Sequence, residues 1–230
     1  GNDSKSKNLL AGNSRFQQLA PLPFVEQEIK QIASLSKSTV AFNETFSQER
    51  LITEAESEDT NIIHLATHAE FIPGRPGKSK IHMENGSFTL NDLRQLRLSR
   101  EEKPLNLFTL SACRTATGDS NSELGLAGLA LLAGAQSAIG TLWYVDDIAT
   151  SIFFIRFYKW LSEGNTKSQA IRLSRDEMIK GLFKVENGQV LDKDGNIVLD
   201  QLSRRQIIKL RQGLSHPYFW AAPVLLGKPW

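Results

Sequence analysis

Cysteine is almost absent from this sequence: Cys113 is the single cysteine among 230 residues. One thiol excludes an internal disulfide framework and a cysteine-rich zinc site. No apolar run reaches the roughly 18 residues that a membrane-spanning helix requires, and the polar N-terminus lacks the apolar core of a signal peptide. We therefore expect a cytoplasmic protein with no membrane partner, in a reducing environment that preserves a free thiol.

An excess of charge of one sign is also lacking. The 27 lysines and arginines nearly balance the 25 aspartates and glutamates, which leaves a net charge of +2. Nucleic-acid binding favours a concentrated basic face, so we expect no nucleic-acid partner. The four histidines do not fall at zinc-ligand spacings, and we expect neither a metal nor another cofactor.

What the sequence does contain is a series of short apolar runs. Such runs are typical of strands that are buried on both faces of a sheet. They alternate with helical patterns up to about residue 180, which indicates a three-layer α/β fold. No internal repeat or low-complexity linker interrupts the chain, so we expect one domain over residues 1–230. The predicted strands cover residues 8–12, 39–42, 61–67, 105–111, 137–142 and 216–226.

Helices are predicted from the 3.6-residue period and from capping signals. A long loop or a hairpin is predicted over residues 69–88, and a small inserted β-hairpin over residues 185–199, with Asp194-Gly195 as its turn. A calcium-loop fragment is the alternative for residues 192–196, although the closing glutamate is lacking. The predicted helices cover residues 24–35, 45–54, 89–96, 124–133, 146–162, 167–180 and 203–212, with 146–162 and 167–180 amphipathic.

Two candidate catalytic side chains follow two of the predicted strands. His68 comes directly after residues 61–67, and Cys113 follows residues 105–111. Ligands of parallel α/β sheets bind at the carboxyl ends of strands, so we expect the imidazole and the thiol at the same edge. Together they form a possible nucleophile and acid/base pair. The alternative is a structural Cys113, because a free cysteine often packs as a small hydrophobe.

The other histidines are expected to have structural or exposed positions. His64 lies on the predicted strand that precedes His68 and is expected to pack inside, with a role as the catalytic base as the alternative. His82 lies in the predicted loop and is expected to be exposed to solvent. His216 precedes Pro217 and several aromatic residues, so we expect a hydrogen bond in the core rather than chemistry.

Two acidic residues begin the predicted helix over residues 146–162. Asp146 and Asp147 lie in its first turn, where negative charge is favoured. They are either helix N-terminal residues alone or part of a substrate pocket, and the sequence leaves both roles open.

The segments around the candidate residues resemble a known family. Ala112-Cys113-Arg114 is similar to the caspase signature Gln-Ala-Cys-(Arg/Gln/Gly)-Gly, in which a histidine lies about 50 residues upstream. His68 lies 45 residues upstream of Cys113 (113 minus 68), while Ser111 and Thr115 resemble the CHAT branch of the same clan. The chain resembles a CHAT domain, a caspase-like module often attached to TPR repeats in bacteria, over residues 22–29, 63–68, 110–115, 125–129, 133–135, 142–147 and 216–222.

This resemblance implies a fold, an activity and a set of site residues. The implied fold is the three-layer caspase-like (caspase/hemoglobinase) fold, with a mostly parallel six-stranded sheet and helices on both faces. The implied activity is that of a cysteine endopeptidase, with Cys113 as nucleophile and His68 as acid/base. The backbone N–H groups of Cys113 and Ala69 are the implied oxyanion donors. Ala69 replaces the usual glycine of the family, which keeps the N–H but narrows the choice of φ.

The resemblance also bears on substrate and partners. Residues 142–147 are similar to a Leu-Trp-Asp-Val-Thr-Asp segment of separase, a related protease, in which an acidic residue receives a basic side chain before the cut. Asp147 falls on the last aspartate and Asp146 replaces the threonine, so the hypothesis is a preference for Arg or Lys. The implied partners are a polypeptide substrate and a regulatory or TPR-type region, N-terminal to this domain in a longer protein from which we expect it to be excised. A catalytically silent interaction module and a thiol-dependent ester hydrolase or acyl transferase are the alternatives.

Overall fold

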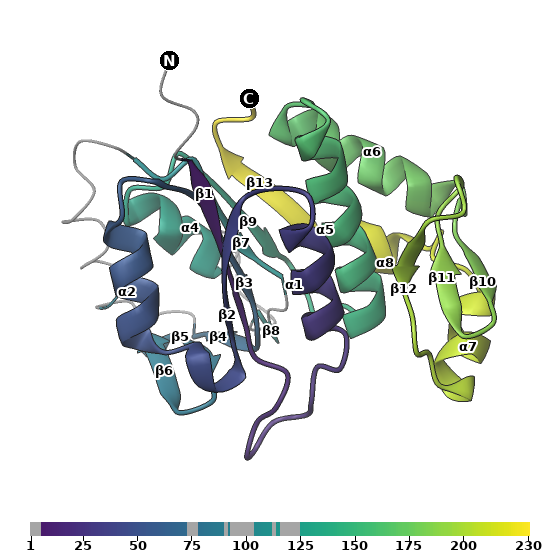
Figure 1. The fold of residues 1–230 in the computed structure, drawn as a ribbon, viewed down its shortest axis with the longest axis horizontal. Coiled ribbons are helices and arrows are strands. Elements are labelled where there is room, and N and C mark those ends of the chain that lie inside the picture. Colours follow the sequence, from purple (N-terminus) through teal and green to yellow (C-terminus); the bar gives the residue numbers. More distant parts are fainter. Residues whose placement is uncertain (1–5, 73–77, 90–91, 93–103, 112–113, 116–124) are drawn as a thin grey trace.

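A six-stranded sheet runs through the centre of the molecule (Figure 1). The computed structural model describes residues 6–72, 78–89, 92, 104–111, 114–115 and 125–230. The strand order is β13-β9-β7-β3-β1-β2, and every neighbouring pair is parallel except β13 with β9. The predicted mixed α/β fold with a mostly parallel six-stranded sheet is therefore confirmed. Its strands are β1 (Lys7–Gly12), β2 (Ser38–Phe42), β3 (Thr60–Ala66), β7 (Leu107–Leu110), β9 (Ser137–Thr141) and β13 (Pro223–Gly227).

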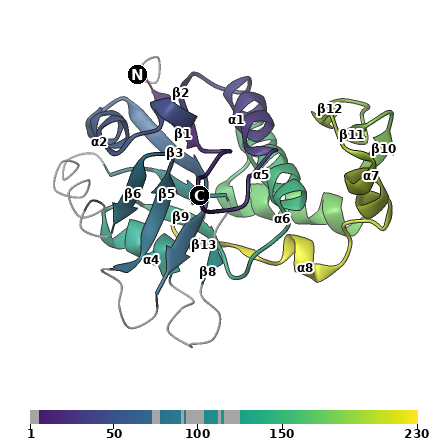
Figure 2. The same cartoon turned by 90° about the horizontal axis from the view of Figure 1, so that it is seen from below.

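Helices cover both faces of this sheet, as Figures 1 and 2 show. Along β1, Leu10 packs into one hydrophobic cluster, while Leu9 and Ala11 pack into the other. Successive strand side chains point to opposite faces, so an uninterrupted apolar run supplies both layers. The helices are α1 (Val25–Ala33), α5 (Asp147–Ser162) and α6 (Lys167–Ile179) on one face, and α2 (Gln48–Glu56) and α4 (Gly125–Leu132) on the other.

Local signals explain where these helices begin. Ser47 accepts a hydrogen bond from the backbone of Arg50 and caps α2, which therefore starts three residues later than predicted. Thr166 and Gln169 form a capping box at the start of α6.

The prediction that α5 is amphipathic is wrong, because residues 148–158 are all buried. The central sheet covers one side of α5, and α6 covers the other together with a small sheet formed by residues 184–199 (Figure 2).

Two small sheets extend the fold beyond the central one. The first has the order β6-β5-β4-β8 and lies where the chain leaves β3 and β7. The second, β10-β11-β12, is antiparallel and covers the segment for which a single hairpin is predicted. Asn187 and Gly188 have φ of 49° and 77° and form a turn that the prediction misses. The strands are β4 (Ala69–Phe71), β5 (Lys80–Met83), β6 (Gly86–Thr89), β8 (Arg114–Thr115), β10 (Lys184–Glu186), β11 (Gln189–Leu191) and β12 (Ile197–Leu199).

The C-terminal part departs from its prediction. Residues 216–226 form a short helix, α8 (Pro217–Trp220), before β13, whereas a single strand is predicted. Pro217 favours this helix because proline fits the first helical turn.

The remaining helices complete the description. The predicted helix over 203–212 is confirmed as α7 (Arg204–Arg211), and Asn43–Thr45 form the 3-10 helix η2. Most of the helix predicted over 89–96 lies outside the described residues. Among the described helices, none is both long and apolar enough to cross a membrane.

Candidate active site

The segments that leave β3 and β7 remain side by side beyond the central sheet. After β3, His68 directly precedes β4, and after β7 the chain reaches β8 at Arg114. Strands β4 and β8 are parallel, with Glu70 paired to Arg114. Cys113 lies outside the described residues, immediately before Arg114 in the sequence. The backbone that follows His68 therefore pairs with the backbone that follows Cys113.

The imidazole of His68 is held by the loop between β1 and α1. Its Nε2 lies 2.8 Å from the carbonyl oxygen of Ala20, and its ring centroid lies 4.7 Å from that of Phe16. A carbonyl oxygen only accepts, so Nε2 carries a proton and Nδ1 is the nitrogen that can accept one from a thiol. Sequence reasoning misses both partners. The available signal is Pro21, which restricts Ala20 to extended conformations and so fixes the direction of its carbonyl group.

A cavity of about 420 Å³ opens beside His68. It lies at the carboxyl ends of β3 and β1, where parallel sheets bind their ligands. The described residues that line it are Leu19, Ala20, His68, Ala69, Glu70, His82 and Tyr144.

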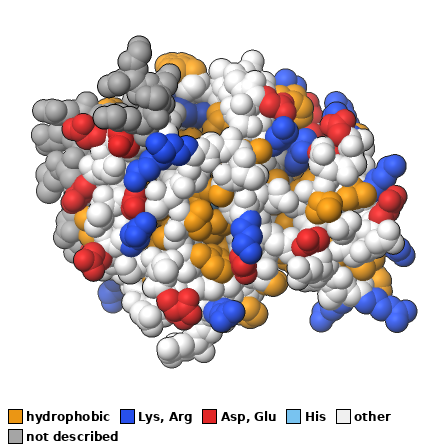
Figure 3. Space-filling view, in the orientation of Figure 1, with side chains coloured by type: hydrophobic (Ala, Val, Ile, Leu, Met, Phe, Trp, Pro, Cys, Tyr) orange, Lys and Arg blue, Asp and Glu red, His pale blue; other side chains and the backbone are white. Residues whose placement is uncertain are grey.

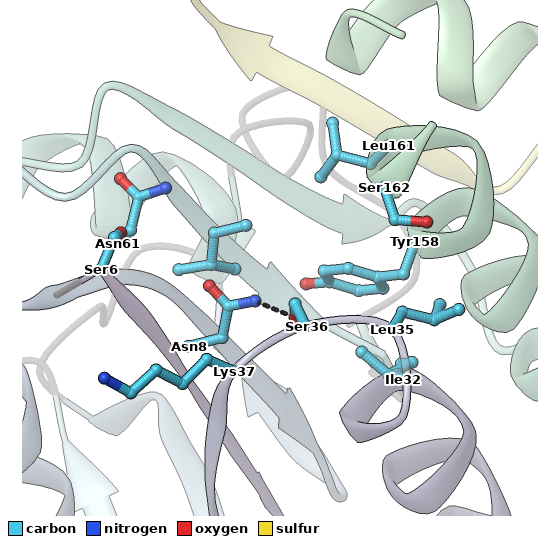
Figure 4. Close-up of a pocket in the computed structure, with 11 residues that line it drawn as sticks. Ser6, Asn8, Ile32, Leu35, Ser36, Lys37, Asn61, Tyr158, Leu161 and Ser162 are labelled. Carbon is cyan, nitrogen blue, oxygen red and sulfur yellow. Dashed lines mark hydrogen bonds between the residues drawn. The ribbon is translucent and has the colours of Figure 1, made fainter. Parts of the chain in front are cut away.

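A second cavity, of about 240 Å³, lies at the opposite end of the sheet (Figure 4). Its wall includes Asn8, whose amide donates to the Ser36 hydroxyl over 2.8 Å, and Tyr158. None of the described residues that line it is a histidine or a carboxylate, so they provide no acid/base pair. The cavity beside His68 is therefore the better candidate for chemistry.

Two residues of the cavity form a hydrogen bond that sequence reasoning does not predict. The Nε2 atom of His82 lies 3.0 Å from Oε1 of Glu70, and the Lys80 ammonium lies 3.9 Å from the other carboxylate oxygen. The expectation that His82 lies exposed in a loop is wrong, because it lies on β5 and only 16% of its side chain is exposed. Glu70 is thus a carboxylate in the cavity wall, close to His68 in sequence and in space.

Ala69 fits its position without strain. It is fully buried, lies opposite Ile81 in the β4–β5 pair, and does not have a positive φ. An extended backbone accepts alanine as well as glycine, so the departure from the family pattern does not distort the strand. Its backbone N–H stays a predicted oxyanion donor.

Asp146 and Asp147 lie at the N-terminus of α5. Asp146 caps the helix by accepting from the backbone of Ile148, and it pairs with Lys209 at 2.7 Å. Asp147 accepts from the backbone N–H of Phe24 at 3.1 Å and so joins α5 to the start of α1. Neither aspartate is among the described residues that line the cavity, whereas Tyr144, two residues before Asp146, is.

The carboxylates at the N-terminus of α5 affect the pKa of Tyr144 and of Asp147. The pKa of Tyr144 is raised, first by burial and then by the carboxylates of Asp147 and Asp146. Burial also raises the pKa of Asp147 to about 7, against the lowering effect of the hydrogen bond from Phe24, and the carboxylates of Glu28 and Asp146 add to the rise. Asp147 therefore titrates near neutral pH.

The two other histidines have clear positions. His64 is fully buried, and its Nε2 lies 2.9 Å from Oε1 of Glu28, so the expectation that it packs inside is confirmed. His216 does not lie in the core: it is exposed, and its Nδ1 accepts from the backbone of Tyr218 as the N-cap of α8. Proline at position 217 starts the helix that His216 caps. Within the described part of the chain, no group of three or more His, Cys, Asp and Glu side chains is arranged to hold a metal.

The fold and the cavity define a mixed α/β protein with a histidine at the carboxyl edge of a mostly parallel sheet. Comparison with protein families gives the class more closely. The profile of the CHAT domain matches residues 1–228, so the chain belongs to the CHAT-domain family. This family is related to the caspases, which agrees with the resemblance seen in the sequence.

No curated protein matches the chain. Among solved structures, the pyridoxal kinase from Staphylococcus aureus in complex with AMP-PCP is similar at 13% identity and a TM-score of 0.35, with 83% of this chain and 93% of that chain covered. A TM-score this low carries no argument about fold or function.

Proposed function

We propose that this CHAT domain is a caspase-like cysteine endopeptidase that uses a dyad of Cys113 and His68. The observation that carries the proposal is the parallel pairing of β4 with β8, with Glu70 opposite Arg114. His68 and Cys113 each precede one of these two strands in the sequence, so chain connectivity favours their meeting at one edge. The six-stranded sheet with its single antiparallel edge strand is consistent with a caspase-like fold.

The chemistry follows from the position of His68. Nδ1 of the imidazole accepts the thiol proton of Cys113, and the thiolate attacks the carbonyl carbon of the scissile bond. The imidazolium then gives its proton to the leaving amine, and water hydrolyses the thioester, which releases the acid and restores the thiol. The carbonyl of Ala20 stabilises the imidazolium, because it accepts from Nε2 throughout. The backbone N–H groups of Ala69 and Cys113 are the proposed oxyanion donors.

Covalent labelling tests this proposal directly. A peptidyl electrophile should label the wild type, while Cys113→Ala and His68→Ala should abolish labelling or reduce it more than about a hundredfold. His216→Ala is the matched control, because this histidine is exposed and lies outside the cavity. Cleavage sites in a protein mixture, mapped by mass spectrometry for the wild type and Cys113→Ala, identify the products. Absence of labelling favours the silent interaction module, and labelling with turnover of esters but not of peptides favours the ester hydrolase.

Specificity for Arg or Lys before the cut is the finer part of the proposal. Asp147, with Asp146, is the proposed partner of the basic side chain, and the proximity of Asp147 to Tyr144 in the cavity wall supports it. A peptide panel that differs only at this position should show the preference, and Asp147→Asn should lower kcat/KM for the Arg peptide about tenfold. Glu70→Gln is the comparison variant: if it alone removes the preference, Glu70 receives the basic side chain instead. A preference for Asp or Leu contradicts both assignments.

A further inference from the structure

A buried carboxylate on α1 connects the two strands that lead to the proposed catalytic residues. Glu28 is 1% exposed, and three side chains among the described residues donate to it. His64 on β3 donates to Oε1 over 2.9 Å, Ser151 on α5 donates to Oε2 over 2.8 Å, and Ser111 at the end of β7 donates to Oε1. All three donors are fully buried. One carboxylate thus joins four elements of the core.

The direction of the His64 donor is fixed by its surroundings. The rings of Phe154 and Tyr158 contact the imidazole in edge-on geometry, with centroid distances of 5.7 Å and 5.2 Å. Nδ1 of His64 is buried and has no hydrogen-bond partner among the described residues, so the tautomer with its proton on Nε2 satisfies the contact to Glu28. The hydrogen bond from His64 therefore joins Glu28 to β3, and the two aromatic rings restrict rotation of the imidazole that donates it.

Ser111 is held at two points. Its backbone N–H donates to the carbonyl of Leu65 on β3 over 2.9 Å, and its hydroxyl donates to Glu28. Ser111 precedes Cys113 by two residues, and Leu65 precedes His68 by three. Ser111, which leads to the proposed nucleophile, therefore bonds through its backbone to β3, which leads to the proposed base, and through its side chain to Glu28 on α1.

We propose that Glu28 is a positioning residue of the active site and acts through Ser111. This inference rests on the proposed function, because it assigns a role around the same Cys113–His68 dyad. A displacement of about 1 Å in a reacting group can reduce a rate by about a hundredfold. A carboxylate with a purely structural role would affect stability without affecting the reactivity of the thiol. The two roles therefore predict different results for the two serines that donate to Glu28.

Ser111→Ala and Ser151→Ala form a matched pair for the test. Each removes one buried hydroxyl that donates to Glu28, but of the two only Ser111 lies between a strand of the central sheet and a proposed catalytic residue, directly after β7 and two residues before Cys113. Because Cys113 is the only cysteine, its alkylation by iodoacetamide can be measured without further mutation. We expect Ser111→Ala to lower the alkylation rate at pH 7 at least about fivefold and kcat at least about tenfold, with KM within about twofold. Ser151→Ala should stay within about twofold of the wild type in each quantity, at a similar loss of thermal stability.

Glu28→Gln provides the conservative variant. Its amide oxygen can accept from His64 and Ser111, while its NH2 group can donate to the Ser151 hydroxyl. We expect Glu28→Gln to retain more alkylation and turnover than Ser111→Ala but less than the wild type, because a neutral amide accepts more weakly than a carboxylate. If Ser111→Ala does not fold, a wild-type alkylation rate in Glu28→Gln overturns the inference. Equal alkylation rates in Ser111→Ala and Ser151→Ala, or a wild-type rate in Ser111→Ala, would overturn the inference. If the wild type cleaves no peptide, the proposed endopeptidase activity fails, while the alkylation comparison still decides the role of Glu28.

Discussion

Nε2 of His68 lies 2.8 Å from the carbonyl oxygen of Ala20, which precedes it by 48 residues in the chain. This contact brings the loop between β1 and α1 to the candidate active site. The ring of Phe16, from the same loop, also contacts the imidazole, with a centroid distance of 4.7 Å. The orientation of the proposed acid/base residue is therefore set by a segment that holds no ionisable catalytic side chain of its own.

Removal of the Phe16 ring should weaken this orientation. We expect Phe16→Ala to lower kcat about tenfold, because the imidazole then samples orientations in which Nδ1 is misdirected. Phe183→Ala is the matched control, since Phe183, like Phe16, is partly buried against the hydrophobic cluster around α5, whereas the described ring contact to His68 comes from Phe16. The measurement is kcat against a peptide substrate at pH 7, with urea unfolding of both variants. A similar loss of kcat in the two variants would contradict a specific role for Phe16.

Asp147→Asn should stabilise the protein in a pH-dependent way. The folded-state pKa of Asp147 is about 7, whereas an aspartate in the unfolded chain has a pKa of about 3.9. The folded state therefore binds a proton more tightly, and ionisation of Asp147 costs stability as the pH rises between these two values. The gain from Asp147→Asn should grow between pH 4 and pH 7 and then become constant, and it should reach a Tm increase of about 3 °C. Scanning calorimetry from pH 5 to pH 8.5 measures it, and a gain that does not depend on pH would contradict the raised pKa.

The buried ion-pair cluster between α5, α6 and the β10–β12 sheet should be essential for stability. Arg156 donates to both carboxylate oxygens of Glu177 and to Asp192, at 2.7–2.8 Å. Because its guanidinium is buried, Glu177→Ala leaves it without its bidentate partner and should cost about 3–5 kcal/mol of unfolding free energy. Asp194→Ala, which removes only an exposed partner of Lys193, should cost less than about 0.5 kcal/mol. Urea unfolding measures both variants, and equal losses would contradict the importance of burial.

Two glycines allow backbone strain to be separated from a steric clash. Gly227 and Gly213 have almost the same φ, 87° and 88°. A Cβ at Gly213 would meet nothing within 4 Å, whereas a Cβ at Gly227 would clash with the carbonyl oxygen of Gln136. We expect Gly213→Ala to cost about 1 kcal/mol and Gly227→Ala about 1–2 kcal/mol more, because the β13–β9 edge must move. Thermal unfolding of both variants measures the difference in stability. Equal Tm values would contradict the expected clash, because they would show that β13 and β9 shift apart at no cost.

Surface charge agrees with the sequence, where acidic and basic residues nearly balance. Figure 3 shows both signs scattered over one face of the molecule rather than gathered into a single basic region. The strands β1, β2, β3, β7 and β9 also lie where short apolar runs predict them. The positions of these strands depend on the local order of apolar and polar residues, so the hydrophobic pattern of the sequence is enough to locate them.

The departures from prediction have longer-range causes. Residues 148–158 of α5 are buried on all sides because α6 and the small sheet cover the face that the sequence leaves open. His82 lies in the cavity wall because β5 pairs with β4. Sequence spacing does not show such pairings, since their partners lie far apart along the chain.

By itself, the sequence determined the alternation of strands and helices, the CHAT-domain motifs, and the two strand ends at which a histidine and a cysteine stand. Only the tertiary structure decided which groups surround His68 and what Glu28 joins. The hydrogen bonds of Glu28 to Ser111 and Ser151 span 83 and 123 residues. A hydrophobic pattern places an element in the core, but the packing of α1 against the sheet and α5 decides which polar atoms meet there.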